Sequence, residues 1–289
     1  MKKLYSNKLH IVIFLLPALI LFCGVLIAPI GASAYFSFFD WDGLQEMKFV
    51  GFDNYKELFN SDRIGFTKAL LNSLLLAALS VCLQLPLALA LALALGKKIK
   101  GERVFLSVYF MPVLISTVVI GQLFLKIYHP KGILNVTLQA LGLGDLKQQW
   151  LSKKTALGAA FFPTLWQYVG YHMLLLYAGV KSVPQELREA AMLDGASDGQ
   201  VNRFIVLPYI KPIIRISVIF AVTGSLKSFD MIYVLFRKSH NVDVPSTLMI
   251  EYLFDRNRYG MGSTIAVLLI LLCFGFALLI NVIFREGAE

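Results

Sequence analysis

The stretch from Ala69 to Gly96 reads ALLNSLLLAALSVCLQLPLALALALALG, which is 28 residues without a single Asp, Glu, Lys or Arg. A helix needs about 20 apolar residues to cross the hydrocarbon core of a bilayer, so this stretch is long enough to do so. A helix is the expected form because lipid offers the backbone no hydrogen-bond partners. The stretch therefore predicts a membrane-spanning helix.

Four other runs of comparable length lack charged residues, and a sixth is interrupted only by Lys227 and Asp230. The whole chain is 57% hydrophobic and 16% charged, whereas soluble domains carry about 25% charged residues. We predict an all-α membrane protein that forms one transmembrane domain over residues 1–289. Its six predicted spans are residues 11–36, 69–95, 104–127, 155–180, 211–236 and 261–284.

The first span has two interpretations. Lys2 and Lys3 precede it, and Ala32-Ser33-Ala34 is similar to a signal-peptide cleavage site. The apolar core of a signal peptide has about 7–15 residues, and the apolar stretch before this triplet is far longer. The pattern favours an uncleaved membrane anchor.

The basic residues predict the orientation of the chain. Six spans place both termini on one side of the membrane, and Lys and Arg are then equally numerous on the two sides. On the side of the termini, however, they lie in shorter segments, such as residues 96–103, and short basic segments stay in the cytoplasm. We expect a multi-pass membrane protein with both termini in the cytoplasm.

The net charge of +9 does not indicate a nucleic-acid-binding protein, because no basic face with interleaved aromatic residues is found. We interpret the basic residues as anchors that orient the spans in the lipid bilayer. Cys23, Cys82 and Cys273 lie within apolar runs and are interpreted as small apolar residues rather than a disulfide framework. The four histidines are scattered, so no metal site is predicted.

The cytoplasmic segment at residues 182–209 carries two helix-start signals. Residues 182–185 (SVPQ) fit a capping box, and the helix they begin is expected to stop at Gly195, which readily adopts a left-handed conformation. Residues 197–200 (SDGQ) form a second capping box, whose helix is expected to end before Pro208. We predict a helix–turn–helix that projects into the cytoplasm.

This hairpin carries more apolar surface than a connector requires, at Leu187, Ala190, Ala191 and Phe204. One interpretation is an amphipathic hairpin that lies back on its own helices. The other is a protrusion that inserts into a groove on a cytoplasmic partner.

At this point the sequence resembles a known family. Residues 189–196 (EAAMLDGA), followed by residues 205–208 (IVLP) and Pro212, are similar to the EAA loop of the permease subunits of ABC importers. Residues 49–55 (FVGFDNY) and 259–262 (YGMG) resemble the sugar-permease branch of that family.

The resemblance implies a MetI-like permease fold and several partners: a second permease subunit that forms a heterodimer with this chain, two cytoplasmic ATPase subunits and an extracytoplasmic sugar-binding protein. It also implies that the EAA loop docks in a cleft of the ATPase. The implied ATPase-coupling residues are Glu189, Ala190, Ala191, Asp194, Gly195, Leu207 and Pro208. Residues 237–245 depart from the Gly-rich stretch of many relatives, so contacts near that outer loop are not transferred.

No phosphate-binding loop of the form G-x-x-x-x-G-K-[ST] occurs in the chain. We therefore expect ATP and Mg²⁺ to bind in the partner ATPase subunits. The chain itself is expected to be a transport subunit rather than an enzyme, to bind no cofactor, and to translocate a sugar such as an oligosaccharide.

A sugar pathway needs hydroxyl partners and flat aromatic faces. Tyr168 and Tyr171 lie three residues apart in the fourth span, and Gly224, Ser225 and Ser228 recur at helical spacing in the fifth. The resemblance implies a substrate pathway along these two helices. Small residues also mark close helix packing, which is the alternative interpretation.

Lys227 and Asp230 are ionisable residues inside the fifth span, where charge is costly. Three residues apart on a helix, they are expected to form an ion pair that faces the bundle interior. The alternative is a charge relay in a proton- or ion-coupled secondary transporter. Such transporters show internal repeats, and none is found here. A membrane-embedded enzyme would need a convergent catalytic set, which the spans do not supply.

Overall fold

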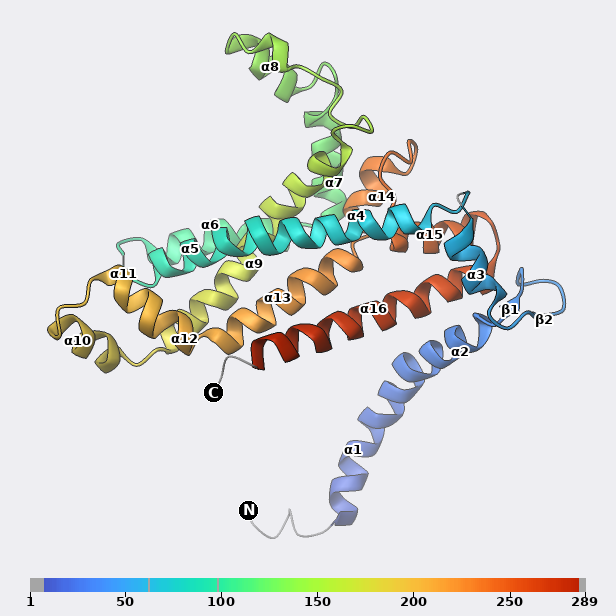
Figure 1. Ribbon diagram of the computed structural model, residues 1–289, viewed down its shortest axis with the longest axis horizontal. Coiled ribbons are helices and arrows are strands. Elements are labelled where there is room, and N and C mark those ends of the chain that lie inside the picture. Colours follow the sequence, from blue (N-terminus) through green and yellow to red (C-terminus); the bar gives the residue numbers. More distant parts are fainter. Residues whose placement is uncertain (1–7, 62, 98, 286–289) are drawn as a thin grey trace. The chain divides into compact units, whose positions relative to one another are not determined.

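The computed structural model describes residues 8–61, 63–97 and 99–285, so Lys2 and Lys3 lie outside the described residues. Helices dominate this part of the chain, and its one sheet has two short strands (Figure 1). The chain divides into two compact units. The first unit comprises residues 1–65 and 248–270, and the second comprises residues 66–247 and 271–289.

The first unit begins with a continuous apolar helix. It runs through α1 (Lys8–Phe22), a π-helical turn (Cys23–Ile27) and α2 (Ala28–Phe36). Residues 12–36 are long and apolar enough to cross a membrane, and none of them is buried. The first predicted span therefore coincides with a helix of suitable length.

A small module of strands and a helix follows α2. Its elements are β1 (Phe39–Asp40), β2 (Lys48–Phe49), which pairs with β1 in antiparallel fashion, and α3 (Asp53–Asn60). The buried side chain of Asn54 donates hydrogen bonds to the carbonyl oxygens of Ser37 and Phe39, at 3.0 and 2.9 Å. These bonds connect α3 to the chain that leaves α2.

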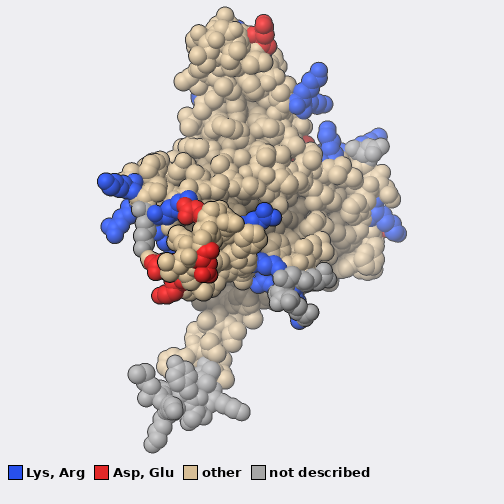
Figure 2. Space-filling view, turned by 60° about the vertical axis from the view of Figure 1, so that its left-hand side comes forward, with Lys and Arg blue, Asp and Glu red and all other residues tan. Residues whose placement is uncertain are grey.

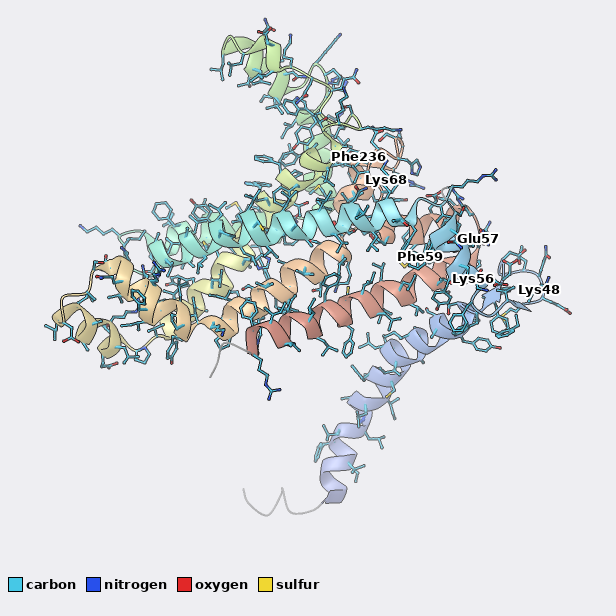
Figure 3. The ribbon with its side chains drawn as sticks, in the orientation of Figure 1. Lys48, Lys56, Glu57, Phe59, Lys68 and Phe236 are labelled. Atoms are coloured by element: carbon cyan, nitrogen blue, oxygen red, sulfur yellow. The ribbon has the colours of Figure 1, made fainter. Side chains whose placement is uncertain are left out.

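A bidentate ion pair closes the same module. Arg258 donates through two guanidinium nitrogens to both carboxylate oxygens of Glu57, which lies on α3 (Figure 3), at 2.8 and 2.9 Å. These charge-assisted bonds hold the pKa of Glu57 below its ordinary value.

The second unit contains the remaining elements. Its long helical segments are α4 (Phe66–Leu79), a π-helical turn (Ser80–Gln84), α5 (Leu85–Leu95), α6 (Glu102–Leu114), α7 (Thr117–Ile127), α9 (Ala156–Ser182), α13 (Lys211–Leu226) and α14 (Asp230–Phe236). Its short elements are α8 (Ile133–Ala140), a 3₁₀ turn (Gly144–Leu146), α10 (Gln185–Leu193), α11 (Asp198–Val201), a π-helical turn (Asn202–Val206) and α12 (Leu207–Tyr209). Two helices contribute to both units, α15 (Pro245–Ile250) and, after a π-helical turn (Glu251–Asp255), α16 (Tyr259–Arg285).

Among the described residues, four helices are long and apolar enough to span a membrane: residues 12–36, 66–95, 211–236 and 259–285. A fifth is added if α6 and α7 count as one broken span. The remaining predicted region forms α9, whose 27 residues extend about 40 Å but include more polar side chains. All six predicted regions are helical, as an all-α membrane fold requires.

Two predicted spans are not continuous helices, which corrects the sequence analysis. Residues 104–127 are broken at Ile115 and Ser116, where the backbone is extended and α7 leaves α6 at an angle of 90°. Residues 211–236 are interrupted between the end of α13 and the start of α14. In both cases hydrogen bonds from elsewhere in the second unit satisfy backbone groups at the break.

Helix α9 is the scaffold of the second unit. Phe161 joins one buried cluster with Phe124 of α7, and Met173 joins another with Ala92 of α5. At Gly170, α9 approaches α6 so closely that a Cβ atom would collide with the carbonyl oxygen of Tyr109. The halves of the broken span are thereby held against a single helix.

Candidate functional site

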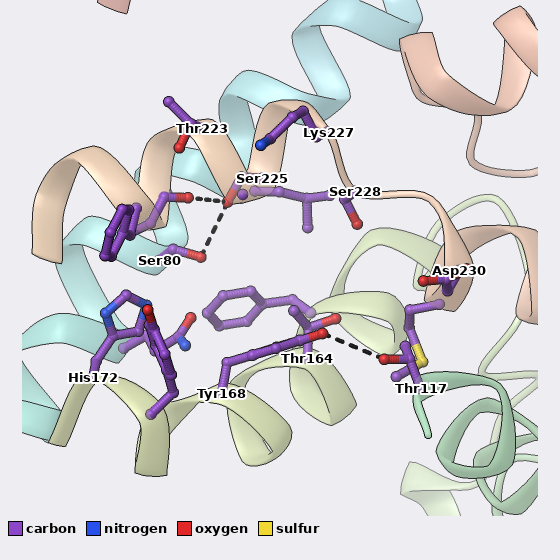
Figure 4. A pocket seen from close by; sticks show the side chains of 18 of the residues that line it. Ser80, Thr117, Thr164, Tyr168, His172, Thr223, Ser225, Lys227, Ser228 and Asp230 are labelled. Atoms are coloured by element: carbon purple, nitrogen blue, oxygen red, sulfur yellow. Dashed lines mark hydrogen bonds between the residues drawn. The ribbon is translucent and has the colours of Figure 1, made fainter. Parts of the chain in front are cut away.

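A cavity of about 480 Å³ lies within the second unit. Its wall is formed by the π-helical turn after α4, by α9, by α13 and by the breaks that follow α6 and α13 (Figure 4). Hydroxyl groups and aromatic rings both contribute to this wall.

All five residues of the predicted substrate pathway line this cavity. Tyr168 and Tyr171 come from α9, whereas Gly224, Ser225 and Ser228 come from α13 and the residues that follow it. The fold therefore brings together two groups that are distant in the sequence. Their role in transport stays a prediction.

Hydrogen bonds order the hydroxyl groups of the wall (Figure 4). Ser225 donates to Oγ of Ser80 at 3.3 Å and to the carbonyl oxygen of Ala221 at 2.8 Å. The hydroxyls of Thr117 and Tyr168 lie 3.3 Å apart in a second hydrogen bond. A hydroxyl group both donates and accepts, so these groups can exchange partners with a polyhydroxylated ligand.

Six further polar residues of the wall were not predicted: Ser80, Gln84, Thr117, Thr164, His172 and Thr223. A signal existed for the first two, because they are polar residues one helical turn apart within the uncharged run quoted above. His172 is 5% exposed, and its Nδ1 has no hydrogen-bond partner among the described residues. A buried nitrogen without a partner at a cavity wall is available to a ligand.

Lys227 and Asp230 also line the cavity, but the expected ion pair is not formed within the described part of the chain. The helix is interrupted between them, since α13 ends before Lys227 and Phe229 has non-helical torsion angles. The two side chains therefore do not share a helix face (Figure 4). At the break, the freed carbonyl oxygen of Ser228 accepts a hydrogen bond from the hydroxyl of Ser246.

The predicted helix stop at Gly195 is confirmed. Its φ is +86°, and α10 ends in a Schellman motif in which Ala196 N–H bonds to Ala191 and Gly195 N–H bonds to Met192. A Cβ atom at Gly195 would have no neighbour within 4 Å. The requirement for glycine therefore comes from the backbone and not from crowding.

The second capping box is confirmed and the first is wrong. Ser197 and Gln200 exchange the two hydrogen bonds of a capping box at the start of α11. Ser182 instead belongs to the last turn of α9 and donates to the carbonyl oxygen of Gly179 at 2.8 Å, so α10 starts after Pro184 without a side-chain cap.

The prediction that the second helix ends before Pro208 is also wrong. The chain widens into a π-helical turn before Pro208 and stays helical through Tyr209. A π-helical turn makes longer-range hydrogen bonds, so the ring of the proline and its missing N–H are accommodated without ending the helix.

The two helices of the hairpin have different surroundings. The segment that starts at α11 packs back on the second unit, with Val201 and Val206 buried beside α5 and α9. Lys97 reinforces this packing through a 2.8 Å ion pair with Asp198. In contrast, α10 has no buried residue, and Leu193 is 88% exposed. The packing interpretation therefore applies to the segment that starts at α11, whereas insertion of α10 into a partner stays a prediction.

The implied coupling residues cluster on the exposed side of this hairpin. Exposed residues are Glu189, Ala190, Asp194, Gly195 and Pro208, whereas Ala191 and Leu207 are half-buried. Figure 2 turns this end of the second unit toward the reader and shows acidic side chains gathered there, with basic side chains around them. The hairpin presents a charged surface with apolar residues between the charges.

The second unit thus combines a cavity lined by hydroxyl groups and aromatic rings with an exposed hairpin. The family described as binding-protein-dependent transport system inner membrane component matches residues 84–286. The chain belongs to this family, and it has the MetI-like permease fold.

Relatives and a solved structure agree with this assignment. The chain is 36% identical to the probable ABC transporter permease protein YurN of Bacillus subtilis, over 98% of this chain and 99% of that protein. It is 32% identical to the multiple sugar-binding transport system permease protein MsmF of Streptococcus mutans, over 90% and 89% of the two chains. A bacterial ABC transporter that imports the acidic polysaccharide alginate has the same fold, with a TM-score of 0.85, 24% identity and coverage of 100% and 99%.

Proposed function

We propose that this chain is the permease subunit of an ABC importer that moves a sugar across the bacterial inner membrane. The observation that carries this proposal is the course of α9. This helix supplies Tyr168 and Tyr171 to the cavity wall and leads directly into the exposed helix α10. One continuous helix, α9, thereby connects the hairpin to the cavity, so a movement of the hairpin can be transmitted to the cavity wall.

The chemistry of the cavity supports a sugar as the substrate. Its wall combines hydroxyl groups, such as those of Ser225 and Thr164, with the rings of Tyr168 and Tyr171. Hydroxyl groups bind the hydroxyls of a sugar, and an aromatic face covers its apolar C–H surface. The relative named for multiple sugars is consistent with this substrate class.

ATP hydrolysis is assigned to partner subunits, because the sequence contains no phosphate-binding loop. In this proposal two cytoplasmic ATPase subunits bind ATP and Mg²⁺, a second permease subunit completes the translocation pathway, and an extracytoplasmic binding protein delivers the sugar. The exposed α10 and Gly195 turn would contact the ATPase, with both termini of the chain in the cytoplasm. An ion-coupled carrier using Lys227 and Asp230 is disfavoured by membership in a binding-protein-dependent family.

The decisive experiment is reconstitution of the tagged chain with its co-expressed subunits in proteoliposomes. We expect an ATPase to co-purify, and we expect uptake of labelled sugar to require both ATP and the loaded binding protein. Uptake driven by a proton or sodium gradient without ATP would contradict the proposal and would support the secondary transporter.

Orientation has a separate test in intact cells. Cysteines introduced at Ser197 and Asn60, both exposed, place a reactive thiol in the hairpin and in the outer module. We expect an impermeant thiol reagent added outside to label Asn60→Cys and to leave Ser197→Cys unlabelled. Labelling of the hairpin from outside would reverse the proposed orientation.

A further inference from the structure

The segment from the last two residues of α7 to the start of α9, residues 126–155, contributes neither to the cavity nor to the hairpin. It is built around Asn135, which is 5% exposed and donates from Nδ2 to the carbonyl oxygens of Pro130 and Gln148, both at 3.1 Å. Its Oδ1 accepts a 2.9 Å hydrogen bond from the indole of Trp150. These bonds orient α8 and determine which of its faces is exposed.

The exposed face of α8 is aliphatic. Ile133 and Val136 are 65% and 58% exposed, and Leu141 and Leu146, which follow the helix, remain equally uncovered. Figure 1 shows α8 beyond the end of α7, apart from α4 and α13 of the same unit. No described helix of the second unit covers this stripe.

The segment that carries the stripe is rich in lysine. The segment contains one acidic residue, Asp145, and five lysines, all exposed: Lys126, Lys131, Lys147, Lys153 and Lys154. Within the described part of the chain none of the five forms an ion pair. In Figure 2 the α8 region, at the top, shows a broad uncharged surface with charged side chains on one side.

This composition favours lipid over a protein partner. Protein interfaces are enriched in Trp, Tyr and Arg and depleted in Lys, and the stripe has no aromatic residue, because Trp150 bonds inward to Asn135. An aliphatic face edged by lysines is typical of helices that lie in the membrane interface. The lysine stems lie along the apolar surface while the ammonium groups reach anionic headgroups.

The stripe also continues the exposed apolar surface of a candidate membrane span. Helix α7, half of a broken candidate span, exposes Val118, Val119 and Leu123 immediately before the segment. We propose that α8 lies in the lipid–water interface where α7 leaves the membrane. Its aliphatic stripe enters the acyl region, and its lysines bind the phosphates of anionic lipids.

The test uses the full chain, purified with its co-expressed subunits and placed in lipid nanodiscs. On a background with Cys23, Cys82 and Cys273 replaced by serine, a nitroxide is attached to Val136→Cys or to Gln139→Cys. The second variant is the matched control, because the Gln139 amide oxygen bonds to Lys147 on the polar side of the helix, at 2.7 Å. Oxygen dissolves in lipid, so relaxation of the nitroxide by oxygen shows that it lies in the lipid phase. Relaxation by a water-soluble nickel chelate shows that it is exposed to water.

We expect the nitroxide at position 136 to be relaxed more strongly by oxygen than by the chelate, and the nitroxide at position 139 to show the opposite preference. The preference at Val136 should be several-fold stronger in phosphatidylglycerol-containing nanodiscs than in phosphatidylcholine alone. The double variant Lys131→Gln, Lys147→Gln should remove that difference. Access of the chelate to Val136 would overturn the proposal, and so would protection from both reagents, because this would place a protein on the stripe. If the oxygen preference at Val136 were the same in both lipid compositions, the proposed role of the lysines would be refuted.

Discussion

The side-chain amide of Gln167 on α9 donates a 3.1 Å hydrogen bond to the carbonyl oxygen of Ile115, the residue that directly follows α6. The same nitrogen donates to Oγ1 of Thr117, the first residue of α7, at 3.0 Å. Gln167 is only 2% exposed. One buried side chain therefore joins both sides of the 90° break, directly beside two residues of the cavity wall.

Replacing this side chain tests its role in holding the break. Gln167→Leu should leave the Ile115 carbonyl oxygen without a donor, at a cost of about 1–3 kcal/mol in stability. The cavity wall at Thr117 and Tyr168 should shift with it, which should raise the half-saturation concentration for uptake. Thermal unfolding in detergent and uptake kinetics measure the two effects.

The control for this variant is Gln122→Leu, because Gln122 is exposed on the neighbouring helix α7. It should change neither quantity. Equal effects of the two substitutions would mean that loss of any glutamine in this region is harmful and that the break is not held by Gln167.

Substitution of Gly195 tests the coupling turn. A Cβ atom at a φ of +86° costs about 1 kcal/mol, so Gly195→Ala should weaken association with the ATPase about fivefold, and Gly195→Pro should weaken it further. Retention of the ATPase on the purified complex and ATPase stimulation by loaded binding protein are measured together.

Gly199→Ala is the matched control, because Gly199 lies in α11 without a positive φ and with open space around it. It should be neutral or slightly stabilising. Full stimulation of the ATPase by the complex containing Gly195→Pro would show that the hairpin is only a connector.

The cavity is tested by two aromatic residues on one helix with equal exposure. Tyr171 and Trp166 are both 38% exposed on α9, but only Tyr171 lines the cavity. Loss of one ring against the substrate should raise the half-saturation concentration of Tyr171→Ala about three- to tenfold. Trp166→Ala should transport with unchanged affinity. Equal affinities of the two variants would refute the pathway and favour helix packing.

The Glu57–Arg258 pair predicts a pH dependence of the module formed by β1, β2 and α3. The folded pKa of Glu57 lies below its ordinary value because Arg258 bonds to the carboxylate. The stabilisation is therefore present above the unfolded pKa of about 4.3 and is lost as pH falls through the folded pKa. Both side chains are partly exposed, so solvent screening limits it to about 1 kcal/mol or less.

Hydrogen exchange of α3 between about pH 7 and about pH 3 measures this effect. Corrected for the intrinsic rate, protection in the wild-type chain should fall with acidification, and Glu57→Gln should start lower and fall less. Glu46→Gln, at an exposed carboxylate with no ion pair in the described residues, should behave as wild type. If the protection of α3 in Glu57→Gln equalled that of the wild-type chain at every pH, the prediction would be refuted.

The sequence by itself determined the features that depend on local physics. Long runs without charge must become helices in lipid, whichever neighbours they have, so the six helical regions could be predicted from composition alone. Gly195 and the pair Ser197 and Gln200 were equally predictable, because a left-handed helix stop and a capping box involve residues within one turn. Tyr168, Tyr171 and Ser225 stood out as polar or aromatic residues inside apolar runs, and the family resemblance pointed to their two helices.

Only the tertiary structure decided where the spans break and which polar residues meet. At the break after α6, Gln167, far away in the sequence, donates to the carbonyl oxygen of Ile115. At the break between Lys227 and Asp230, the hydroxyl of Ser246 donates to the carbonyl oxygen of Ser228. The prediction of an ion pair between Lys227 and Asp230 assumed that both residues lie on one unbroken helix, and this pair does not form. Ser80, Gln84 and His172 share a cavity only because α4 and α9 pack together. Such contacts depend on three-dimensional packing, and no local pattern encodes them.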